Sequence, residues 1–275
     1  MKTRLTIVAI AIMVIVLTGC GGGSKGTINS LSDLKGKVIG TIAGSASEKS
    51  YVEMMTTFIG TEPKEVIPMY RRSDLLAGIL TGKIDAAASP KIITEYYAKR
   101  NNNLKIIDQP KLFEVNIVMA VRSEDGILKA GLDSAITILR GKGTLKLLED
   151  KWIINLPATN EPAFEEIAKI NGARTVYVGV SGDFAPLDYI AADGRPAGYN
   201  VALLAEIGKL LNVNFEIVSI ETQAKFVALE SKKIDAVFFH WSGKEIGQFF
   251  ADIKRNYIVT IPYYTDKAGY FLVKK

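Results

Sequence analysis

Apolar and polar positions alternate along the chain in two different periods from residue 30 onwards. Short runs in which every second residue is apolar predict strands, whereas apolar residues three or four positions apart predict helices. The two kinds of run follow one another in turn, which is typical of an α/β fold with largely parallel sheets. The predicted strands are residues 38–42, 65–68, 84–88, 104–107, 115–121, 176–180, 214–220, 234–239, 257–261 and 270–273. The predicted helices are residues 45–58, 73–80, 92–100, 125–140, 144–152, 164–170 and 222–230, with one more after Asn200.

The stretch 175–213 combines these signals most clearly. A strand with valines at alternate positions is followed by a loop that holds Phe184 and Pro186. The turn signal Asp193-Gly194 then separates two short extended runs. Asn200 is a good N-cap for the amphipathic helix that completes the stretch. A strand, a hairpin and a helix are therefore expected in succession.

A short internal repeat links the two halves of the chain. Residues 78–86 and 228–236 both contain a helix end, a basic turn and a strand that opens with Ile-Asp-Ala. Two similar α/β lobes would give this repeat, and so would convergence on a common helix–turn–strand shape. Asp85 and Asp235 open their strands, and we expect them to have structural roles.

The first twenty residues predict an export signal rather than a part of the fold. Lys2 and Arg4 give a positive start, residues 5–17 form an apolar run too short for a comfortable membrane span, and Cys20 follows Leu-Thr-Gly. This tetrapeptide resembles the lipobox of bacterial lipoproteins, which implies that Cys20 is acylated and holds the protein to a lipid bilayer. The alternative is an incidental cysteine at the end of a simple membrane anchor. Both interpretations place the protein outside the cytoplasmic membrane, in the cell envelope.

Composition and charge narrow the classes of function. The 275 residues are 48% hydrophobic and 23% charged, with a net charge of +5, which is an ordinary globular balance. The basic residues are scattered and form nothing longer than adjacent pairs such as Arg71-Arg72 and Lys254-Arg255, so no clustered face indicates a nucleic-acid partner. Cys20 is the sole cysteine, so no disulfide framework is expected. The chain has one histidine and no group of residues with metal-ligand spacing. We therefore expect no metal and no cofactor, and these features argue against an enzyme.

The stretch 175–213 resembles the N-terminal opening of the bacterial extracellular solute-binding proteins that serve polar amino-acid ABC transporters. A Pro-Tyr-Tyr at 262–264 and a hinge strand at 270–274 follow it, as in the first lobe of that family. The family's second lobe opens with a Ser-Leu-x-Asp-Leu-Lys-Gly-Lys segment, which is found here at 30–37, much earlier in the chain. Its return hinge strand and terminal helices correspond to residues 116–152. Every part is present once, in rotated order.

This order implies a circularly permuted, two-lobed periplasmic-binding-protein type II fold, α/β throughout, in which each lobe is a mostly parallel sheet flanked by helices. The alternatives are a truncated tandem of two half-domains and a domain-swapped dimer, although we expect a monomer. Only the segment near 115–121 would then cross between the lobes continuously, unless residues 270–273 still pair beside it. The expected parts are a signal peptide at 1–19, a lipidated cysteine and tether at 20–29, lobe 2 at 30–115, a return strand and terminal helices at 116–154, a permutation linker at 155–173, and lobe 1 at 174–275, which ends in the cut hinge strand.

The resemblance implies a solute site between the two lobes. In lobe 1, Phe184 falls at the stacking aromatic of the family, and Asp183 lies near the mouth of the site, where it could meet a cation. Ser242 falls at a hydroxyl position that contacts the ligand, with His240 and Trp241 just before it. The alternative for Phe184, His240 and Trp241 is a packed residue of the lobe.

The other wall of the implied site comes from lobe 2. Gly44, Ser45 and Ser47 lie at a helix N-terminus where the family binds a carboxylate, because backbone N–H groups suit an anion there. A simple capped helix is the alternative. Ser89 follows a strand and faces the same site in the family's geometry.

Two departures from the family leave the solute open. The carboxylate-binding arginine has no direct counterpart, with Lys244 and Arg255 as substitutes, and no acidic residue follows Ser89 to bind an ammonium group. We therefore expect a membrane-anchored receptor that closes on a small polar solute, amino acid-like or otherwise anionic, and delivers it to the permease of an ABC importer. A sensor or partner-binding module without transport is the alternative. A periplasmic dehydratase-like enzyme is a third interpretation.

Overall fold

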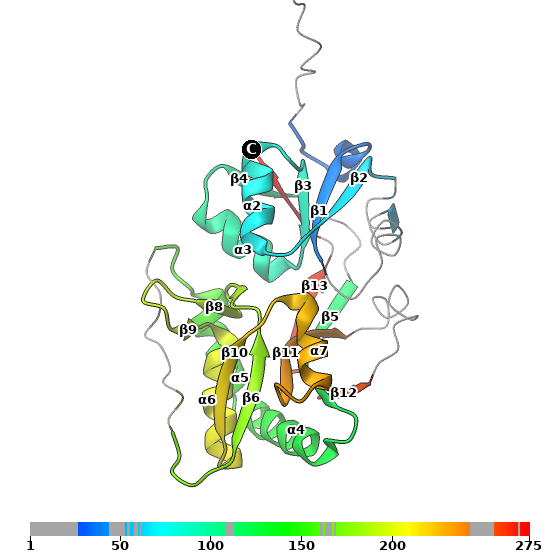
Figure 1. The fold of residues 1–275 in the computed structure, drawn as a ribbon. Coiled ribbons are helices and arrows are strands. Elements are labelled where there is room, and N and C mark those ends of the chain that lie inside the picture. The colour runs from blue at the N-terminus through cyan, green and yellow to red at the C-terminus, as the bar shows by residue number, and fades with distance from the viewer. Residues whose placement is uncertain are drawn as a thin grey trace, which may run out of the picture.

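The computed structural model describes residues 27–43, 62–107, 113–159, 169–242, 256–268 and 270–275, with the single positions 53, 56, 57, 60, 162 and 167. These residues form two α/β lobes, which lie one above the other in Figure 1. The lobe at the top contains the segment expected to form lobe 2, and the lobe at the bottom contains most of the segment expected to form lobe 1, so these names are kept. The expected two-lobed α/β fold is confirmed.

Lobe 2 is built on a five-stranded sheet. Its strands are β1 Val38–Ile42, β2 Glu65–Met69, β3 Ala86–Ser89, β4 Leu104–Ile107 and β14 Tyr270–Lys274, and its helices are η1 Leu31–Leu34, α2 Arg72–Thr81 and α3 Lys91–Arg100. The order is β2-β1-β3-β14-β4, with β1 parallel to β2 and β3, and β14 antiparallel to both of its neighbours. Leu75 and Ile79 of α2 and Tyr97 of α3 pack on one face. Leu34 of η1 is buried against the other face.

Lobe 1 is built on a six-stranded sheet and a small hairpin sheet. The large sheet contains β5 Phe113–Arg122, β6 Thr175–Val180, β10 Asn214–Ser219, β11 Ala236–Ser242, β12 Tyr257–Val259 and β13 Tyr264–Ala268. The small sheet contains β7 Asp183–Phe184, β8 Asp188–Ile190 and β9 Pro196–Ala197. The helices are α4 Gly126–Gly141, α5 Thr144–Glu149, the π-helical η2 Asp150–Ile154, α6 Tyr199–Leu211, η3 Thr222–Ala224 and α7 Lys225–Glu230.

The helices of lobe 1 cover both faces of its sheet. Leu132 of α4, Trp152 of η2 and Leu204 of α6 belong to the large core on one face. Leu229 of α7 packs on the other face with Val237 of β11. Strands β10, β6 and β11 pair in parallel, whereas β5 is antiparallel to β11, β12 and β13. The expected parallel pairing is thus present in each lobe, and the antiparallel pairs of the two large sheets all involve β5 or β14.

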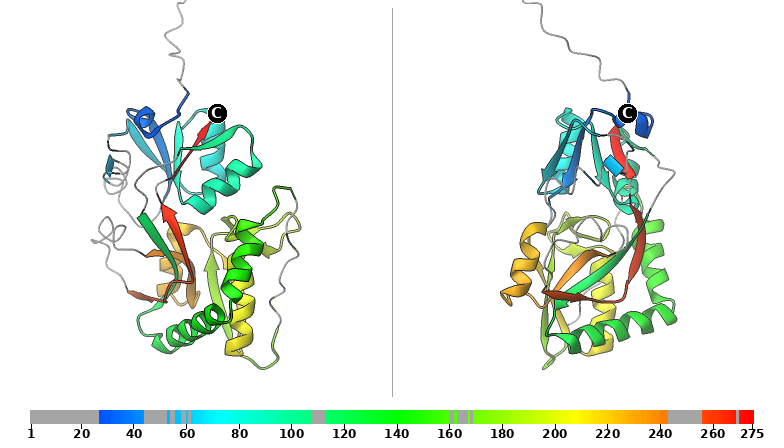
Figure 2. Two further views of the ribbon diagram at one scale, coloured as in Figure 1. Left: turned by 180° about the vertical axis from the view of Figure 1, so that it is seen from behind. Right: turned by 90° about the vertical axis from the view of Figure 1, so that its right-hand side faces the viewer.

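Two neighbouring strands join the lobes. β5 leads from lobe 2 into lobe 1, and β13 runs antiparallel beside it, from Tyr264 opposite Ile117 to Ala268 opposite Phe113. β14 follows β13 and lies in the sheet of lobe 2. Figure 2 shows β5 and β13 side by side between the lobes in both of its views. The chain therefore retains a second crossing strand.

Residues 270–273 do not pair beside 115–121, contrary to the arrangement considered from the sequence. Phe271 of β14 lies opposite Ala88 of β3 and Ile107 of β4, so the strand is a central one in lobe 2. The strand beside β5 is β13, which the hydrophobic pattern did not predict. Asp266 and Lys267 interrupt that pattern, and both residue types are depleted in strands.

The aspartates of the internal repeat occupy equivalent places in the two lobes. Oδ2 of Asp85 accepts the Val38 N–H of the neighbouring strand at 2.9 Å, and Oδ2 of Asp235 accepts the Tyr177 N–H at 3.0 Å. Asp235 also pairs with the buried guanidinium of Arg122 at 2.9 Å. Both aspartates thus tie the start of one strand to the next, which confirms their structural roles.

The isoleucines of the same repeat explain why one strand position in each lobe is occupied by glycine. Ile84 is 1% exposed and Ile234 is 0% exposed. A Cβ on Gly40 would lie 2.4 Å from Cδ1 of Ile84, and a Cβ on Gly179 would lie 2.6 Å from Cδ1 of Ile234. Each glycine therefore makes room for the isoleucine of its own lobe, and the two lobes share one packing solution.

Helix α6 begins two residues earlier than the sequence indicates. Gly198 is its N-cap residue, and Asn200 lies inside the first turn, so the prediction of Asn200 as N-cap is wrong. The Asn200 side chain is buried and donates from Nδ2 to Oδ2 of Asp188 at 2.9 Å. An asparagine that has this partner in the hairpin sheet does not need to bind its own helix.

Several predictions lie outside the described residues. They are the export signal with Cys20, most of the predicted helix at 45–58, and most of the predicted helix at 164–170. Within the part of the chain that the structure describes, none of the helices has the length and apolar character needed to cross a membrane.

Candidate functional site

A buried ion pair joins the two lobes. Nη1 of Arg72, at the start of α2 in lobe 2, lies 3.2 Å from Oδ1 of Asp183 in β7 of lobe 1. The backbone N–H of Arg72 donates to the other carboxylate oxygen at 2.9 Å. The guanidinium carbon lies 3.4 Å from the ring centroid of Phe184. In lobe 1, Asp183 thus binds the edge of the Arg72 guanidinium, and the adjacent Phe184 packs against its face.

The position of Arg72 in α2 is unfavourable without this partner. A cation in the first turn of a helix faces the positive end of the helix dipole. The N-cap residue, Arg71, makes no capping hydrogen bond with its side chain. The carboxylate of Asp183 corrects both defects because it accepts the first-turn N–H and neutralises the guanidinium. Lobe 1 therefore supplies the cap for a helix of lobe 2.

Two further buried charges belong to this site. Asp188 of β8 is 1% exposed, and Lys225, the first residue of α7, is 3% exposed. Burial lowers the pKa of Lys225 to about 8, and the attraction of Asp188 and Asp183 acts against this shift. Burial raises the pKa of Asp188, and Lys225 opposes that shift. With Arg72, the site holds two cations and two carboxylates, so its charges balance.

Aromatic residues of α3 close the same interface from lobe 2. The ring of Tyr96 lies 6.5 Å from that of Tyr189 in lobe 1. Burial raises the pKa of Tyr97 to about 12, and the neighbouring Arg72 acts in the opposite direction. The tyrosines therefore keep water away from the charged groups, which strengthens the interactions between those groups.

Of the predicted site residues that the structure describes, it brings Phe184 and Asp183 together at this interface. Phe184 is 1% exposed, and the guanidinium of Arg72 covers its ring. His240 lies elsewhere, in an aromatic group with Phe226 and Tyr257, where Nε2 is 2.9 Å from the Tyr257 hydroxyl. These contacts match the alternative of a packed polar residue.

The remaining predicted residues are placed in part or lie outside the described residues. Ser242 ends β11 opposite Asn116, and Ser89 ends β3 opposite Tyr270; both are partly exposed. Trp241 is placed by its backbone only, opposite Ile117. The predicted residues outside the described part of the chain are Gly44, Ser45, Ser47 and Lys244.

Sequence reasoning missed Arg72, Asp188 and Lys225. Arg72 had one local signal, because an Arg-Arg pair directly before a helix needs an anion from elsewhere in the fold. Asp188 and Lys225 had none, since acidic and basic residues at such positions are usually solvated. Their burial depends on the way segments far apart in the sequence come together, which no local pattern shows.

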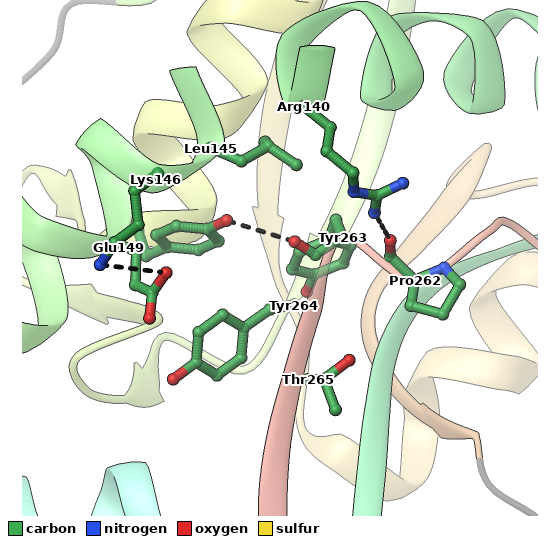
Figure 3. A pocket seen from close by; sticks show the side chains of 9 residues that line it. Arg140, Leu145, Lys146, Glu149, Pro262, Tyr263, Tyr264 and Thr265 are labelled. Atoms are coloured by element: carbon green, nitrogen blue, oxygen red, sulfur yellow. Dashed lines mark hydrogen bonds and ion pairs between the residues drawn. The ribbon is translucent and has the colours of Figure 1, made fainter. Parts of the chain in front are cut away.

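An open pocket of about 560 Å³ lies away from this interface, on lobe 1 beside the crossing strand β13. Figure 3 shows that its walls come from α4, α5, α6 and β13. Its charged groups already have partners within the chain: Arg140 bonds the Pro262 carbonyl, and Lys146 lies 2.6 Å from Asp150 and 3.8 Å from Glu149. Among the predicted site residues that the structure describes, none lines this pocket, so we prefer the interface between the lobes as the candidate site.

Asp266 of β13 ties the crossing strand to lobe 2. Its Oδ2 accepts the Ile92 N–H at the start of α3 at 3.0 Å, and the residue is 7% exposed. Burial raises its pKa from 3.8 to about 6, while the Ile92 N–H and Lys91 act in the opposite direction and Glu95 adds to the shift. Because the folded pKa is raised, the stabilising contribution is full below about pH 4 and is lost as the pH rises through about 6.

Replacing Asp266 by Asn should remove this pH-dependent contribution while an amide oxygen still accepts the Ile92 N–H. The shift of roughly two pKa units corresponds to about 3 kcal/mol. We expect the free energy of unfolding of Asp266→Asn, relative to that of the unsubstituted protein, to fall by up to this amount between pH 7 and pH 4. Urea unfolding at both pH values measures the difference. An equal difference at the two pH values would contradict the raised pKa.

Two segments of the chain match known protein families. Residues 176–274, from β6 to β14, match the family described as bacterial extracellular solute-binding proteins, family 3. The resemblance drawn from residues 175–213 is thereby confirmed. A second match, to the family described as NMT1/THI5 like, spans residues 6–117. The two matches do not overlap, and residues 118–175 between them belong to neither match.

Curated relatives carry names of the same kind. The arginine-binding extracellular protein ArtP of Bacillus subtilis (strain 168) is 33% identical over 128 residues, which are 46% of this chain and 48% of ArtP. The ABC transporter arginine-binding protein 1 of Escherichia coli (strain K12) is 24% identical over 132 residues, 46% of this chain and 52% of that protein. The chain spans about half the length of the curated relatives it matches.

Solved structures align with more of the chain at lower identity. Tv2483 bound to L-arginine aligns with a TM-score of 0.45 and 15% identity, covering 87% of this chain and 77% of that chain. The GluR0 ligand-binding core in complex with L-glutamate aligns with a TM-score of 0.41 and 12% identity, covering 87% and 82%.

Proposed function

We propose that this protein is an extracytoplasmic solute-binding receptor that holds a small polar solute between its two lobes and delivers it to the permease of an ABC importer. The family match over residues 176–274 carries this proposal, because the matched segment contains Asp183 and Phe184, the lobe 1 side of the interface. The related proteins of B. subtilis and E. coli are named as arginine-binding. An amino acid-like solute is therefore the first class to test.

The order of the two family matches supports a circular permutation as part of the proposal. The segment that resembles the family's opening begins at β6, in the second half of the chain, and ends in β14. β14 completes a sheet whose other strands come from residues 38–107. One chain thus supplies each lobe with strands from both of its halves, as a rotated single domain does. In a truncated tandem each half would instead lack its partner lobe, and in a domain-swapped dimer the two halves would come from different chains.

A lipid anchor at Cys20 is the last part of the proposal. It is supported by the positive start, the short apolar run and the Leu-Thr-Gly-Cys sequence. An anchor of this kind would keep the receptor near the permease, with the two lobes outside the membrane.

Solute binding should depend on Phe184. A ligand that binds in excess raises the melting temperature by mass action, so a thermal-shift screen of the amino acids identifies a solute. Replacing Phe184 by Ala removes the aromatic face, and we expect the affinity for that solute to fall about tenfold, or ~1.4 kcal/mol. Isothermal titration calorimetry measures the change.

Tyr177 provides the matched control for this experiment. It is an aromatic residue of lobe 1 that is 41% exposed and lies in β6 away from the interface. Tyr177→Ala should leave the affinity unchanged. If no small solute shifts the melting temperature of the unsubstituted protein, the proposed function is wrong.

A further inference from the structure

The guanidinium of Arg72 shows which chemistry the lobe 1 side of the interface accepts. A flat cation that is stacked on an aromatic ring needs a centroid distance below about 6 Å, and Arg72 lies at 3.4 Å over Phe184. A carboxylate at the edge of the cation completes the arrangement, and Oδ1 of Asp183 lies 3.2 Å from Nη1. Phe184 and Asp183 together thus form a small subsite for a flat cation.

The subsite and its occupant come from different lobes. Phe184 and Asp183 are neighbours in β7 and move together, whereas Arg72 is held to them only when the lobes are in contact. Arg72 is also 7% exposed in its side chain, so its removal from the subsite requires the lobes to separate. The residue therefore resembles a tethered ligand more than a fixed part of the wall.

We propose that Arg72 occupies a subsite for guanidinium-bearing solutes, formed by Phe184 and Asp183, and that such a solute binds by displacing it. This inference rests on the proposed function, because it takes the interface between the lobes as the solute site. The displaced Arg72 keeps its positive charge, and the entering solute supplies the flat cation that Phe184 and Asp183 then hold.

The flat shape of the cation distinguishes this subsite from a general anionic one. A guanidinium is planar, remains charged and is weakly hydrated, so it can stack on Phe184 while it bonds Asp183. A compact ammonium ion is strongly hydrated and has no face to stack. The subsite should therefore prefer a guanidinium over an ammonium group of the same charge.

Chemical rescue tests the subsite without any natural solute. Arg72→Ala in the full chain vacates the subsite. Methylguanidinium at about 10 mM should then raise the melting temperature of the variant by about 3 °C. Methylammonium, which has the same charge, should give no such rise, and the unsubstituted protein should respond to neither. An equal response of variant and unsubstituted protein to methylguanidinium would overturn the subsite.

Competition tests the displacement. If Arg72 fills the subsite nine-tenths of the time, the apparent affinity for a competing solute is reduced about tenfold. L-Arginine should therefore bind Arg72→Ala about tenfold more tightly than the unsubstituted protein, and L-citrulline, its uncharged analogue, should gain nothing. Equal or weaker binding of L-arginine to the variant would overturn the displacement, because Arg72 would then be a partner of the solute.

Two further variants complete the experiment. Arg71 is the exposed neighbour of Arg72, and Arg71→Ala, which makes the same change in net charge, should behave as the unsubstituted protein does. Arg72→Lys keeps the charge but not the planar face, so it should also bind L-arginine more tightly than the unsubstituted protein does. This variant replaces Arg72→Ala in the experiment if Arg72→Ala does not fold. If methylguanidinium rescues Arg72→Ala while no amino acid binds either protein, the proposed function fails and the subsite stands.

Discussion

Replacing Phe271 by Ala is expected to destabilise the protein by about 3–5 kcal/mol, the cost of removing a fully buried aromatic side chain. Phe271 lies in β14 and is 0% exposed, in the core that Ile39, Val66 and Ile107 also form. Since β14 is the strand between β3 and β4, a cavity at this position weakens both of its pairings. A typical domain has only about 5–15 kcal/mol in total, so lobe 2 should be close to unfolding.

Urea unfolding of Phe271→Ala measures this loss. Lys275 follows β14 directly and is exposed, and its backbone N–H, which the substitution keeps, donates to the Asn103 carbonyl at 2.8 Å. Lys275→Ala should therefore change the free energy of unfolding by less than about 0.5 kcal/mol. A loss below about 1 kcal/mol for Phe271→Ala would show that β14 is not seated in the sheet of lobe 2.

Replacing Gly198 by Ala should have an effect of similar size for a different reason. Gly198 has a φ of +110°, and a Cβ there would lie 2.4 Å from the Leu187 carbonyl oxygen and 2.7 Å from that of Pro186. Both contacts are to backbone, which cannot turn aside as a side chain can. We expect the free energy of unfolding to fall by about 3 kcal/mol or more, from strain and displacement together.

The effect of Gly198→Ala should also reach the candidate site. The Leu187 and Pro186 carbonyls accept the Asn200 and Tyr199 N–H groups at the start of α6, and Asn200 in turn binds Asp188. Gly194 is the matched control, because it has a φ of +85° with nothing within 4 Å of the added Cβ. Gly194→Ala should cost about 1 kcal/mol, the backbone term alone. Similar losses for the two variants in thermal unfolding would rule out the steric explanation.

Local patterns predicted most elements of the fold, for a physical reason. Thr175–Val180 has valines at alternate positions, Val38–Ile42 is a short run rich in apolar residues, and both are strands. Gly82 ends α2 in the left-handed conformation, with a φ of 77°, as a glycine after a helix does. The missed strand β13 shows the limit of such patterns. It is held by its pairing with β5 and not by its own apolar residues.

The candidate site was predictable only on one side. Phe184 was found because the segment around it resembles the opening of a known family, and Asp183 because it lies near the mouth of the site that this resemblance implies. Arg72 comes from a helix 111 residues away in sequence, so only the contact between the lobes brings the three together. The burial of Lys225 and Asp188 depends on the same contact. A single sequence records which residues lie on an element but not which elements meet.

The place of β14 between β3 and β4 also determines the order in which the molecule can be assembled during translation. β3 and β4 leave the ribosome long before β14 does, and until then a gap separates them, with two unpaired strand edges beside it. Lobe 2 therefore cannot complete its sheet until the last strand of the chain has been made, and pairing of such distant segments is slow. Chaperones that shield open strand edges would act on this protein for most of its synthesis.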